Sequence, residues 1–448
     1  MSRQPEPTKV PRERILVCGA LLPGQPVEHA GPLSEARSLV EAAGAEVVGE
    51  EDEPLVQRRQ RPDPSSLLGK GKVQEVKDAI GRHRPDAVLV DNDLAPAQGR
   101  NLEKLLGKRV IDRSELILDI FASRARTRQA KLQVELAQME YLRPRLRRMW
   151  THLERTEGAI GTRGPGETQL ETDRRLIAKR IRDLKGRLAE IEQRKRRQVG
   201  SRSELFTVGL VGYTNAGKST LLNRVTGAEE FVADMPFATL DTRTRQWRLE
   251  DGRTVLLSDT VGFLSRLPHH LVASFHATLE EALNVDLLVH VVDASHPDAA
   301  DQMAAVDETI AQLTNRDTDL IILNKTDRVG DPIHLQLLRE GRSQAFVHLS
   351  ARTGEGLDRL DRLVAERLNA RSTVVEARLS VTDGKSAAAL RRLAVVLSET
   401  VEGEDTFVLR LRLPEGAFGA LRDALAGAVR FEVLEPAAES CLPTDLSA

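Results

Sequence analysis

The first 122 residues alternate short apolar runs with amphipathic stretches. Between the first two runs, SEARSLVEAAGA (34–45) spaces its apolar residues as one face of a helix. Strand-like runs lie at 14–20, 45–50, 87–94 and 108–113. Strands that alternate with helices are typical of a parallel sheet covered on both faces. We therefore predict an N-terminal parallel α/β domain over 1–122.

Apolar residues recur every three or four positions in two segments between 123 and 202. These are Leu132, Leu136, Met139 and Leu146, and then Ile177, Ile181, Leu184, Leu188 and Ile191. Two helices with one apolar stripe each bury it most simply against one another, which predicts an antiparallel helical hairpin. The connection EGAIGTRGPGET (157–168) holds four glycines and one proline. It predicts a mobile, non-helical loop.

Strand-like and helical patterns alternate again beyond residue 203. The strand-like runs are FTVGLVGY (206–213), TVLLSDTVG (254–262), LLVHVVDA (287–294), DLIILNKTD (319–327) and AFVHLSAR (345–352). From 371 the order changes to strand (374–381), helix (385–397), strand (405–413), helix (416–427) and strand (430–436). The predicted fold class is a multidomain α/β chain that ends in a small α+β domain over 371–448.

The chain as a whole is nearly neutral in net charge. The 448 residues are 29% charged and 40% apolar, enough for two to four cores. The formal charge of −2 argues against a generally basic nucleic-acid binder. Residues 121–200, however, hold 21 Lys and Arg against 10 Asp and Glu, so this segment carries about +11. A basic surface is therefore expected on the hairpin.

Three further features of the sequence indicate the cellular compartment of the protein. Only two cysteines occur, Cys18 and Cys441, too few for a disulfide framework, and they favour a reducing cytoplasm. The polar start MSRQPEPTKVPRER lacks the apolar core of a signal peptide. The most apolar run, 285–294, is too short to cross a bilayer. We expect a soluble cytoplasmic monomer without stable membrane insertion.

One segment carries the phosphate-binding pattern G-x-x-x-x-G-K-[ST]. It consists of Gly212, Tyr213, Thr214, Asn215, Ala216, Gly217, Lys218 and Ser219. An apolar run precedes it and a helical pattern follows, as this loop requires. Its backbone N–H groups would face phosphate at a helix N-terminus. Lys218 would neutralise the β- and γ-phosphates, and the Ser219 hydroxyl would bind Mg²⁺.

Four further elements follow in order at predicted strand ends or loops. Asp259 would hold Mg²⁺ and the Gly262 N–H would meet the γ-phosphate. Asp327 would accept guanine's N1–H and exocyclic amine, which adenine cannot offer. Thr239 would order over Mg²⁺ when the γ-phosphate is present, so the predicted metal ligands are Ser219, Thr239 and Asp259. The complete segments are Phe237, Ala238, Thr239, Leu240 and Asp241; Asp259, Thr260, Val261 and Gly262; Asn324, Lys325, Thr326 and Asp327; and Ser350, Ala351 and Arg352. Together these elements indicate a guanine-nucleotide switch that binds GTP and GDP.

Three segments outside these five elements make a resemblance to one known protein family specific. They are GKGKVQEV (69–76), the stretch 112–146, and GTRGPGETQLETDRR (161–175). With the five elements they resemble the HflX family of translation-factor-class GTPases over most of 60–365. The resemblance implies an N-terminal α/β domain, a helical hairpin over 123–202, a Ras-like P-loop G domain over 203–370, and a variable C-terminal domain.

The resemblance also implies a function. It implies a Mg²⁺-dependent GTP hydrolase that binds the 50S ribosomal subunit, its rRNA and its proteins. When GTP is bound, it would separate stalled ribosomes or 70S particles. The loop Gly158–Glu167 would reach toward the peptidyl-transferase centre. The residues alone leave two alternatives open: an RNA-remodelling GTPase, or a signalling switch directed at a protein partner.

One position bears on the rate of GTP hydrolysis. We assign catalytic roles to Lys218, Thr239, Gly262 and Phe263. Ras-like switches carry a water-orienting glutamine after Asp-x-x-Gly. Phe263 occupies that position and can neither donate nor accept a hydrogen bond. Slow hydrolysis by the isolated protein and acceleration by the ribosome are therefore expected.

Overall fold

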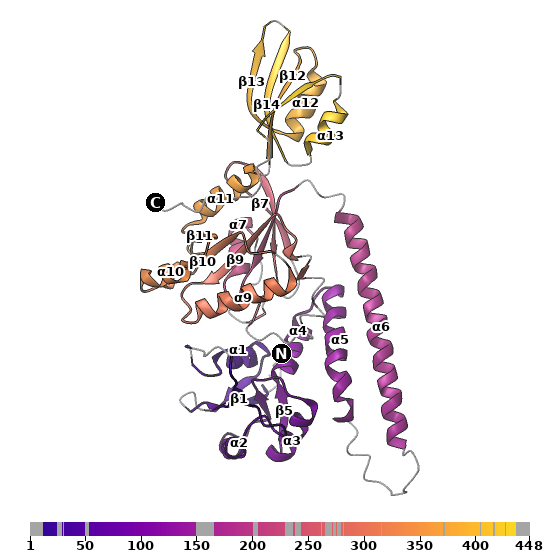
Figure 1. The fold of residues 1–448 in the computed structure, drawn as a ribbon, viewed down its shortest axis with the longest axis vertical. Helices are drawn as coiled ribbons and strands as arrows, with labels where there is room; N and C mark the ends of the chain where they lie inside the picture. Colours follow the sequence, from indigo (N-terminus) through magenta and orange to yellow (C-terminus); the bar gives the residue numbers. More distant parts are fainter. Residues whose placement is uncertain are drawn as a thin grey trace, which may run out of the picture.

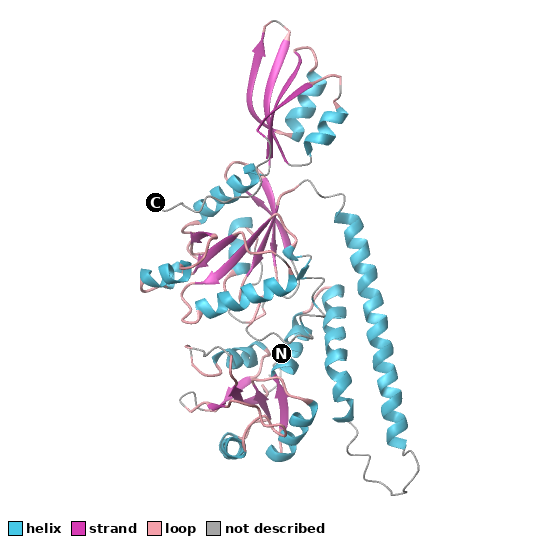
Figure 2. Cartoon of the chain, viewed as in Figure 1, coloured by secondary structure: helices cyan, strands magenta, loops and turns pink. Residues whose placement is uncertain are grey.

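The computed structural model arranges three sheets along one long axis, with two long helices beside them (Figures 1 and 2). Both termini of the chain lie outside the part that the structure describes. The described residues are 12–24, 29, 31–49, 53–148, 165–199, 205–228, 236–237, 243–260, 262–264, 271, 275, 279–280, 282–314, 316–370, 372–403, 405–414, 417–425 and 427–435.

The N-terminal sheet is parallel, with strand order β2-β1-β4-β5 and with β3 also paired to β1. Its strands are β1 (Arg14–Leu21), β2 (Glu46–Val48), β3 (Leu55–Arg58), β4 (Ala87–Val90) and β5 (Arg109–Asp112). Its helices are α1 (Ser34–Ala42), α2 (Lys70–His83), α3 (Pro96–Leu106) and α4 (Arg113–Arg124). The apolar pattern did not predict β3, because this short strand is only half-buried and shows no alternation.

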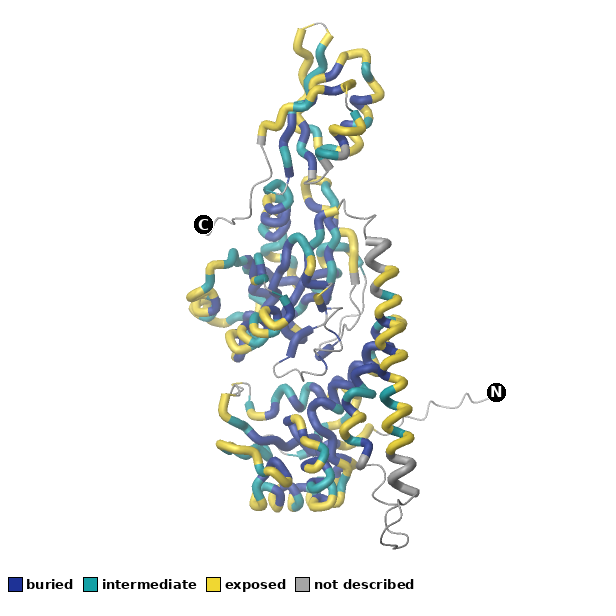
Figure 3. Tube along the Cα trace, turned by 45° about the vertical axis from the view of Figure 1, so that its right-hand side comes forward, coloured by how far each residue is buried: buried dark blue, intermediate teal, exposed yellow. Residues whose placement is uncertain are grey.

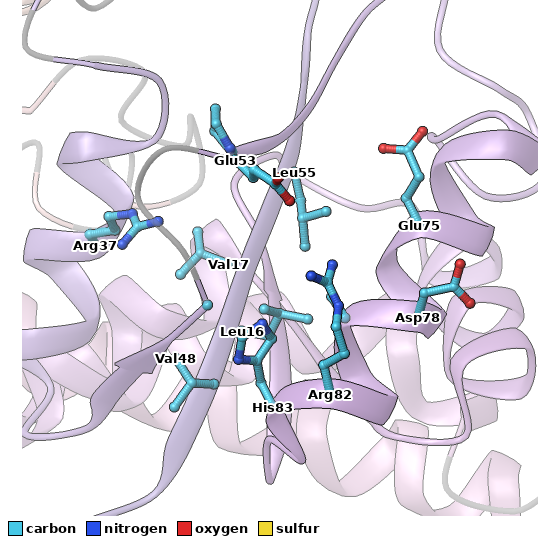
Figure 4. A pocket seen from close by; sticks show the side chains of 13 residues that line it. Leu16, Val17, Arg37, Val48, Glu53, Leu55, Glu75, Asp78, Arg82 and His83 are labelled. Carbon is cyan, nitrogen blue, oxygen red and sulfur yellow. The ribbon is translucent and has the colours of Figure 1, made fainter.

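The edge of this sheet is interrupted beside β1. β2 pairs with the first half of β1 and β3 with its second half. A hollow of about 340 Å³ lies at the break, between β1 and α2 (Figure 4). Its lining carries both signs of charge, from Arg37 and Arg82 and from Glu53, Glu75 and Asp78. It contains none of the residues predicted to bind nucleotide.

The basic segment forms two helices, α5 (Arg128–Leu142) and α6 (Pro165–Val199), with the short η1 (Arg143–Arg148) after α5. They lie side by side, and α6 starts at the end of the pair where α5 finishes (Figure 1). The residues buried between them are Leu132, Leu136, Ile181, Leu184 and Leu188. The apolar stripes predicted from the sequence thus face one another, except that Leu146 lies in η1, after the end of α5, and outside this cluster.

The predicted non-helical loop over 157–168 is wrong at its end, since α6 already begins at Pro165. Proline is well tolerated in the first turn of a helix, where its missing N–H has no helical acceptor. Residues 157–164 lie outside the described part of the chain.

The central sheet has six strands in the order β11-β10-β9-β6-β8-β7, all parallel except β7. The strands are β6 (Thr207–Val211), β7 (Arg243–Arg248), β8 (Thr254–Asp259), β9 (Leu287–Asp293), β10 (Leu320–Asn324) and β11 (Ala345–His348). The helices are α7 (Lys218–Thr226), α9 (Ala299–Leu313), η2 (Thr326–Arg328), α10 (Pro332–Arg339) and α11 (Leu357–Ala370). Helices α7 and α11 cover one face, and α9 and α10 contribute to the apolar clusters of the other.

The last sheet is antiparallel, with order β13-β14-β12-β15 and two helices. Its elements are β12 (Ser372–Ser380), α12 (Gly384–Leu393), β13 (Val395–Glu402), β14 (Thr406–Pro414), α13 (Ala417–Ala424) and β15 (Arg430–Glu435). The prediction of a helix through 397 is wrong, because the helix ends at Leu393 and β13 follows. β13 is an edge strand with most of its side chains exposed, so burial gives it no pattern to recognise (Figure 3).

No helix within the described residues is both long enough and apolar enough to cross a membrane.

Substitution of Leu184 tests the packing of the helical pair. Its side chain is 0% exposed, so Leu184→Ala should destabilise the α5–α6 contact by about 2–5 kcal/mol. Leu176→Ala removes a side chain that is 59% exposed on the same helix and should cost less than about 0.5 kcal/mol. Hydrogen exchange of peptides from α5 and α6 measures both. Equal protection in the two variants would contradict the packing.

Candidate nucleotide-binding site

The phosphate-binding pattern lies between β6 and α7, at the carboxyl edge of the central sheet. Gly217 ends the loop with φ of +95°. A Cβ there would lie 2.3 Å from the side-chain nitrogen of Asn324, so only glycine fits. Asn324 in turn donates to the carbonyl of Ala216 (2.8 Å) and accepts from the N–H of Ala351 (3.0 Å). One amide therefore joins three loops of the site.

Lys218 begins α7 and is almost completely buried. Its Nζ donates to the carbonyls of Gly212 (2.9 Å) and Tyr213 (2.7 Å). Burial lowers the pKa of Lys218 to about 8, although Asp259 partly opposes this. The negative charge of a phosphate at the N-terminus of α7 would favour the ammonium form again.

The next residue, Ser219, donates its hydroxyl hydrogen to Oδ2 of Asp259 at 2.6 Å. Asp259 ends β8 and is buried. Hydroxyl and carboxylate oxygens are the ligands that Mg²⁺ prefers, and both lie next to Lys218. The donor set therefore fits the predicted magnesium site at these two residues.

The segment after Asp259 packs directly on the phosphate loop. The Thr214 N–H donates to the carbonyl of Phe263 (2.7 Å), and the Phe263 N–H donates to the carbonyl of Gly212 (3.1 Å). A Cβ at Gly262 would lie 3.3 Å from Nζ of Lys218, so this residue borders the phosphate end. Thr260 is turned toward β6, where its hydroxyl donates to the carbonyl of Leu210.

The loops after β10 and β11 form the end of the site that is predicted to bind the base. Oδ1 of Asp327 accepts from the Ser350 hydroxyl at 2.6 Å, and Oδ2 lies 2.7 Å from Nη2 of Arg352. The hydrogen bond from Ser350 and the charge of Arg352 lower the pKa of Asp327. Lys325 has a left-handed φ of +60°, and its Nζ donates to Asp293 at 2.6 Å. Thr326 begins the short η2.

The predicted residues that the structure describes thus collect at one edge of the sheet, although several of them do not face a ligand. Ala238, Thr239, Leu240, Asp241 and Val261 lie outside the described residues, and Thr239 is the third predicted metal ligand. Phe237 and Phe263 are fully buried, so their rings pack rather than face a ligand. Asn324, Thr260 and the Ala351 N–H are engaged by protein atoms.

A contact between the phosphate loop and the N-terminal domain was not predicted from the sequence. The Tyr213 hydroxyl donates to Glu35 in the first turn of α1. Glu35 pairs with Arg113 at 2.7 Å, and Arg113 pairs with Asp91 at 2.6 Å. Burial opposes the charge of Arg113, but the carboxylates of Glu35 and Asp91 outweigh it and raise the pKa of Arg113. Glu35 and Tyr213 are 178 positions apart, so no local pattern could have paired them.

Aromatic and polar contacts extend this interface. The ring of Phe121 on α4 meets that of Phe237 edge-on at 4.6 Å. Nδ1 of His29 lies 2.7 Å from Asp298, the residue before α9. Phe121, Phe237 and Phe263 belong to one buried cluster with residues of α1, α4 and β9. The N-terminal domain therefore touches the segments that follow β6 and β8.

This fold and site define the protein as a P-loop GTPase. Family models match 31–122 ("GTP-binding GTPase N-terminal"), 124–202 ("GTP-binding GTPase Middle Region") and 207–325 ("50S ribosome-binding GTPase"). GTPase HflX of Lacrimispora saccharolytica is 42% identical over 92% of this chain and 96% of its own. That of Escherichia coli is 42% identical over 85% and 89%, respectively. The chain belongs to the HflX family of GTPases.

Solved structures are more distant. A GTP-binding protein of Sulfolobus solfataricus in complex with GDP is 23% identical, with a TM-score of 0.41 over 79% of this chain and 98% of that one.

The lowered pKa of Lys218 predicts how phosphate binding depends on pH. Below pH 8 the ammonium is charged before binding, and affinity should be flat. Above pH 8 the free protein must take up a proton, so GDP affinity should fall up to about tenfold per pH unit. Calorimetry between about pH 7 and 9 measures this. Guanosine, which has no phosphate, is the control and should show little dependence; a flat GDP profile would contradict the assignment.

Tyr213→Phe tests the contact with Glu35. Removal of the hydroxyl takes a donor from a half-buried carboxylate and should cost about 1–3 kcal/mol of stability. The less restrained loop should also bind GDP more weakly, by up to about tenfold.

Tyr141→Phe is the matched control. The Tyr141 hydroxyl also contacts a carboxylate, that of Glu115 at 3.3 Å, but this contact joins α5 to α4 and includes none of the predicted nucleotide-binding residues. It should lower stability without changing GDP affinity. Equal effects of the two variants on GDP affinity would refute a specific role of Tyr213.

Proposed function

We propose that this GTPase binds the 50S ribosomal subunit in its GTP state and acts as a ribosome-splitting or rescue factor. The observation that carries the proposal is the basic outer face of α6, since such a face suits a phosphate backbone. The proposed units are 1–122, 123–202, 203–370 and 371–448. A target on the ribosome would also place the protein in the cytoplasm, as its cysteine content suggests.

The exposure of the cationic side chains on α6, as well as their charge, supports binding to a phosphate backbone. Its exposed cationic residues are Arg174, Arg175, Lys179, Arg180, Arg182, Lys185, Arg187 and Arg194. Two of them are tied to α5, because Arg180 pairs with Glu135 and Lys185 with Glu140. The other six are exposed and therefore accessible to a polyanion.

The nucleotide would control this surface through the phosphate end of the site. We assign the β- and γ-phosphates to Lys218, and the metal to Ser219, Asp259 and Thr239. Mg²⁺ would neutralise phosphate charge there. Asp327 would read guanine. Because the phosphate loop contacts α1 and the buried cluster includes α4, a change at Gly262 or Phe237 would reach the N-terminal domain that leads into α5.

Hydrolysis by the isolated protein should be slow. Phe263 is 1% exposed and has no polar group, so it cannot orient the attacking water. The 50S subunit would have to supply a polar group or reposition this segment. The segment Gly158–Glu167, whose last three residues form the start of α6, is proposed to reach toward the peptidyl-transferase centre.

Co-sedimentation with purified 50S subunits tests the proposal, with GDP and with a non-hydrolysable GTP analogue. The GTP-state protein should bind, and 50S should raise GTP turnover many-fold. Arg175→Glu with Arg182→Glu should weaken binding and reduce its salt dependence, since fewer counterions are released. Arg392→Glu with Arg422→Glu, exposed on the C-terminal domain, makes the same charge change and should have little effect.

The alternatives give different results. Binding to free RNA as strong as to 50S, with the same salt dependence, would favour an RNA-remodelling GTPase. No binding to either, with GTP hydrolysis intact, would favour a switch directed at a protein and would reject the ribosomal proposal.

A further inference from the structure

The carboxylate proposed to read guanine has a partner on each oxygen. Oδ1 of Asp327 accepts from Ser350, and Oδ2 lies 2.7 Å from the guanidinium of Arg352. The Asp327 side chain is only 12% exposed, whereas that of Arg352 is 68% exposed. The carboxylate is thus held by one buried partner and one exposed partner.

The outer partner has the same donor chemistry as the base. Guanine presents N1–H and an exocyclic amine on one N–C–N unit, and arginine presents parallel N–H groups on a planar guanidinium. Both the base and the guanidinium can therefore donate a pair of N–H groups to a carboxylate. Each carboxylate oxygen can accept two hydrogen bonds, so the Ser350 hydroxyl can stay on Oδ1 when a base arrives. Arg352 on Oδ2 occupies the place that the base needs.

Arg352 is also the partner that can leave. Its exposed guanidinium is readily solvated by water, and exposed ion pairs contribute little stability. Ser350 is fully buried, and its hydroxyl also accepts from the N–H of Thr353, so it is fixed in the loop. The contact of Arg352 is therefore the exchangeable one.

We propose that Arg352 is an internal competitor of guanine at Asp327 and thereby sets the affinity and exchange rate of the nucleotide. The inference rests on the proposed role of Asp327. Arg352 orients the carboxylate before binding, gives way to the N–H groups of guanine, and returns as the base departs. The competition lowers the affinity for guanine nucleotides and keeps their exchange fast.

Arg352→Ala in the full-length protein tests this. GDP affinity, measured with the unlabelled nucleotide, should rise about two- to fivefold, because an exposed ion pair of ordinary strength no longer competes. Dissociation should slow in step. Arg352→Lys, which keeps the charge but loses the planar pair of donors, should lie between the two. Arg362→Ala is the matched control, since Arg362 is 67% exposed and pairs with Asp358 at 2.8 Å away from the site.

Inosine diphosphate provides a second readout. It lacks the exocyclic amine and needs only one carboxylate oxygen, so Arg352 can keep the other. Arg352→Ala should therefore tighten inosine diphosphate less than GDP. A general loosening of the loop would change both nucleotides equally and would overturn the proposal.

A variant of Asp327 separates the proposed competition by Arg352 from the proposed recognition of guanine by Asp327. Asp327→Asn should shift preference from guanosine toward xanthosine diphosphate. If it does, and Arg352→Ala weakens GDP binding or matches Arg362→Ala, the competitor role is wrong and the base assignment stands. If Asp327→Asn leaves the preference for guanosine unchanged, the base assignment fails and this inference fails with it.

Discussion

The side chain of Asn324 holds together the two ends of the nucleotide site. It ends β10, donates to the phosphate loop at Ala216, and accepts from Ala351 in the loop after β11. Because it is buried, an unmatched amide there would be costly, which keeps all three loops in register. The positions of Lys218 and Asp327 relative to each other follow from this one group.

A second constraint acts across domains. Arg113 is completely buried between two carboxylates, and one of these, Glu35, also receives the Tyr213 hydroxyl. A charge group of this kind is stable only when every member keeps its partner. The phosphate loop is therefore anchored to the N-terminal sheet, while Phe121 and Phe237 close the same interface with apolar contact.

The chemical residues of the site were predictable because short-range spacing encodes them. Asp259 ends a strand with a plain apolar run, and Lys218, Ser219 and Asp327 lie in segments that follow such strands. Parallel strands bring their carboxyl ends to one edge. The pairing of Glu35 with Tyr213 was not predictable, since tertiary packing alone brings them together. Glu35 is an ordinary acid in a first turn, and Tyr213 an ordinary loop residue.

The same distinction applies to the fold. The stripes of α5 and α6 predicted their contact because each is long and regular. β3 and β13 escaped prediction because half-buried and exposed edge strands carry no alternation, and apolar residues at 394–397 continued the preceding helical pattern. The start of α6 at Pro165 was hidden by the glycines before it.

The anchoring of Tyr213 has a consequence for the N-terminal domain. In parallel sheets the crevice beyond the carboxyl ends of the strands is where ligands usually bind. Here Asp91 follows β4, Arg113 follows β5, and Glu35 opens the helix after β1, so all three stand at that edge. Their side chains are committed to each other and to a neighbouring domain's loop. At the crevice where such a domain would ordinarily bind a small molecule, this domain instead binds a loop of the same chain.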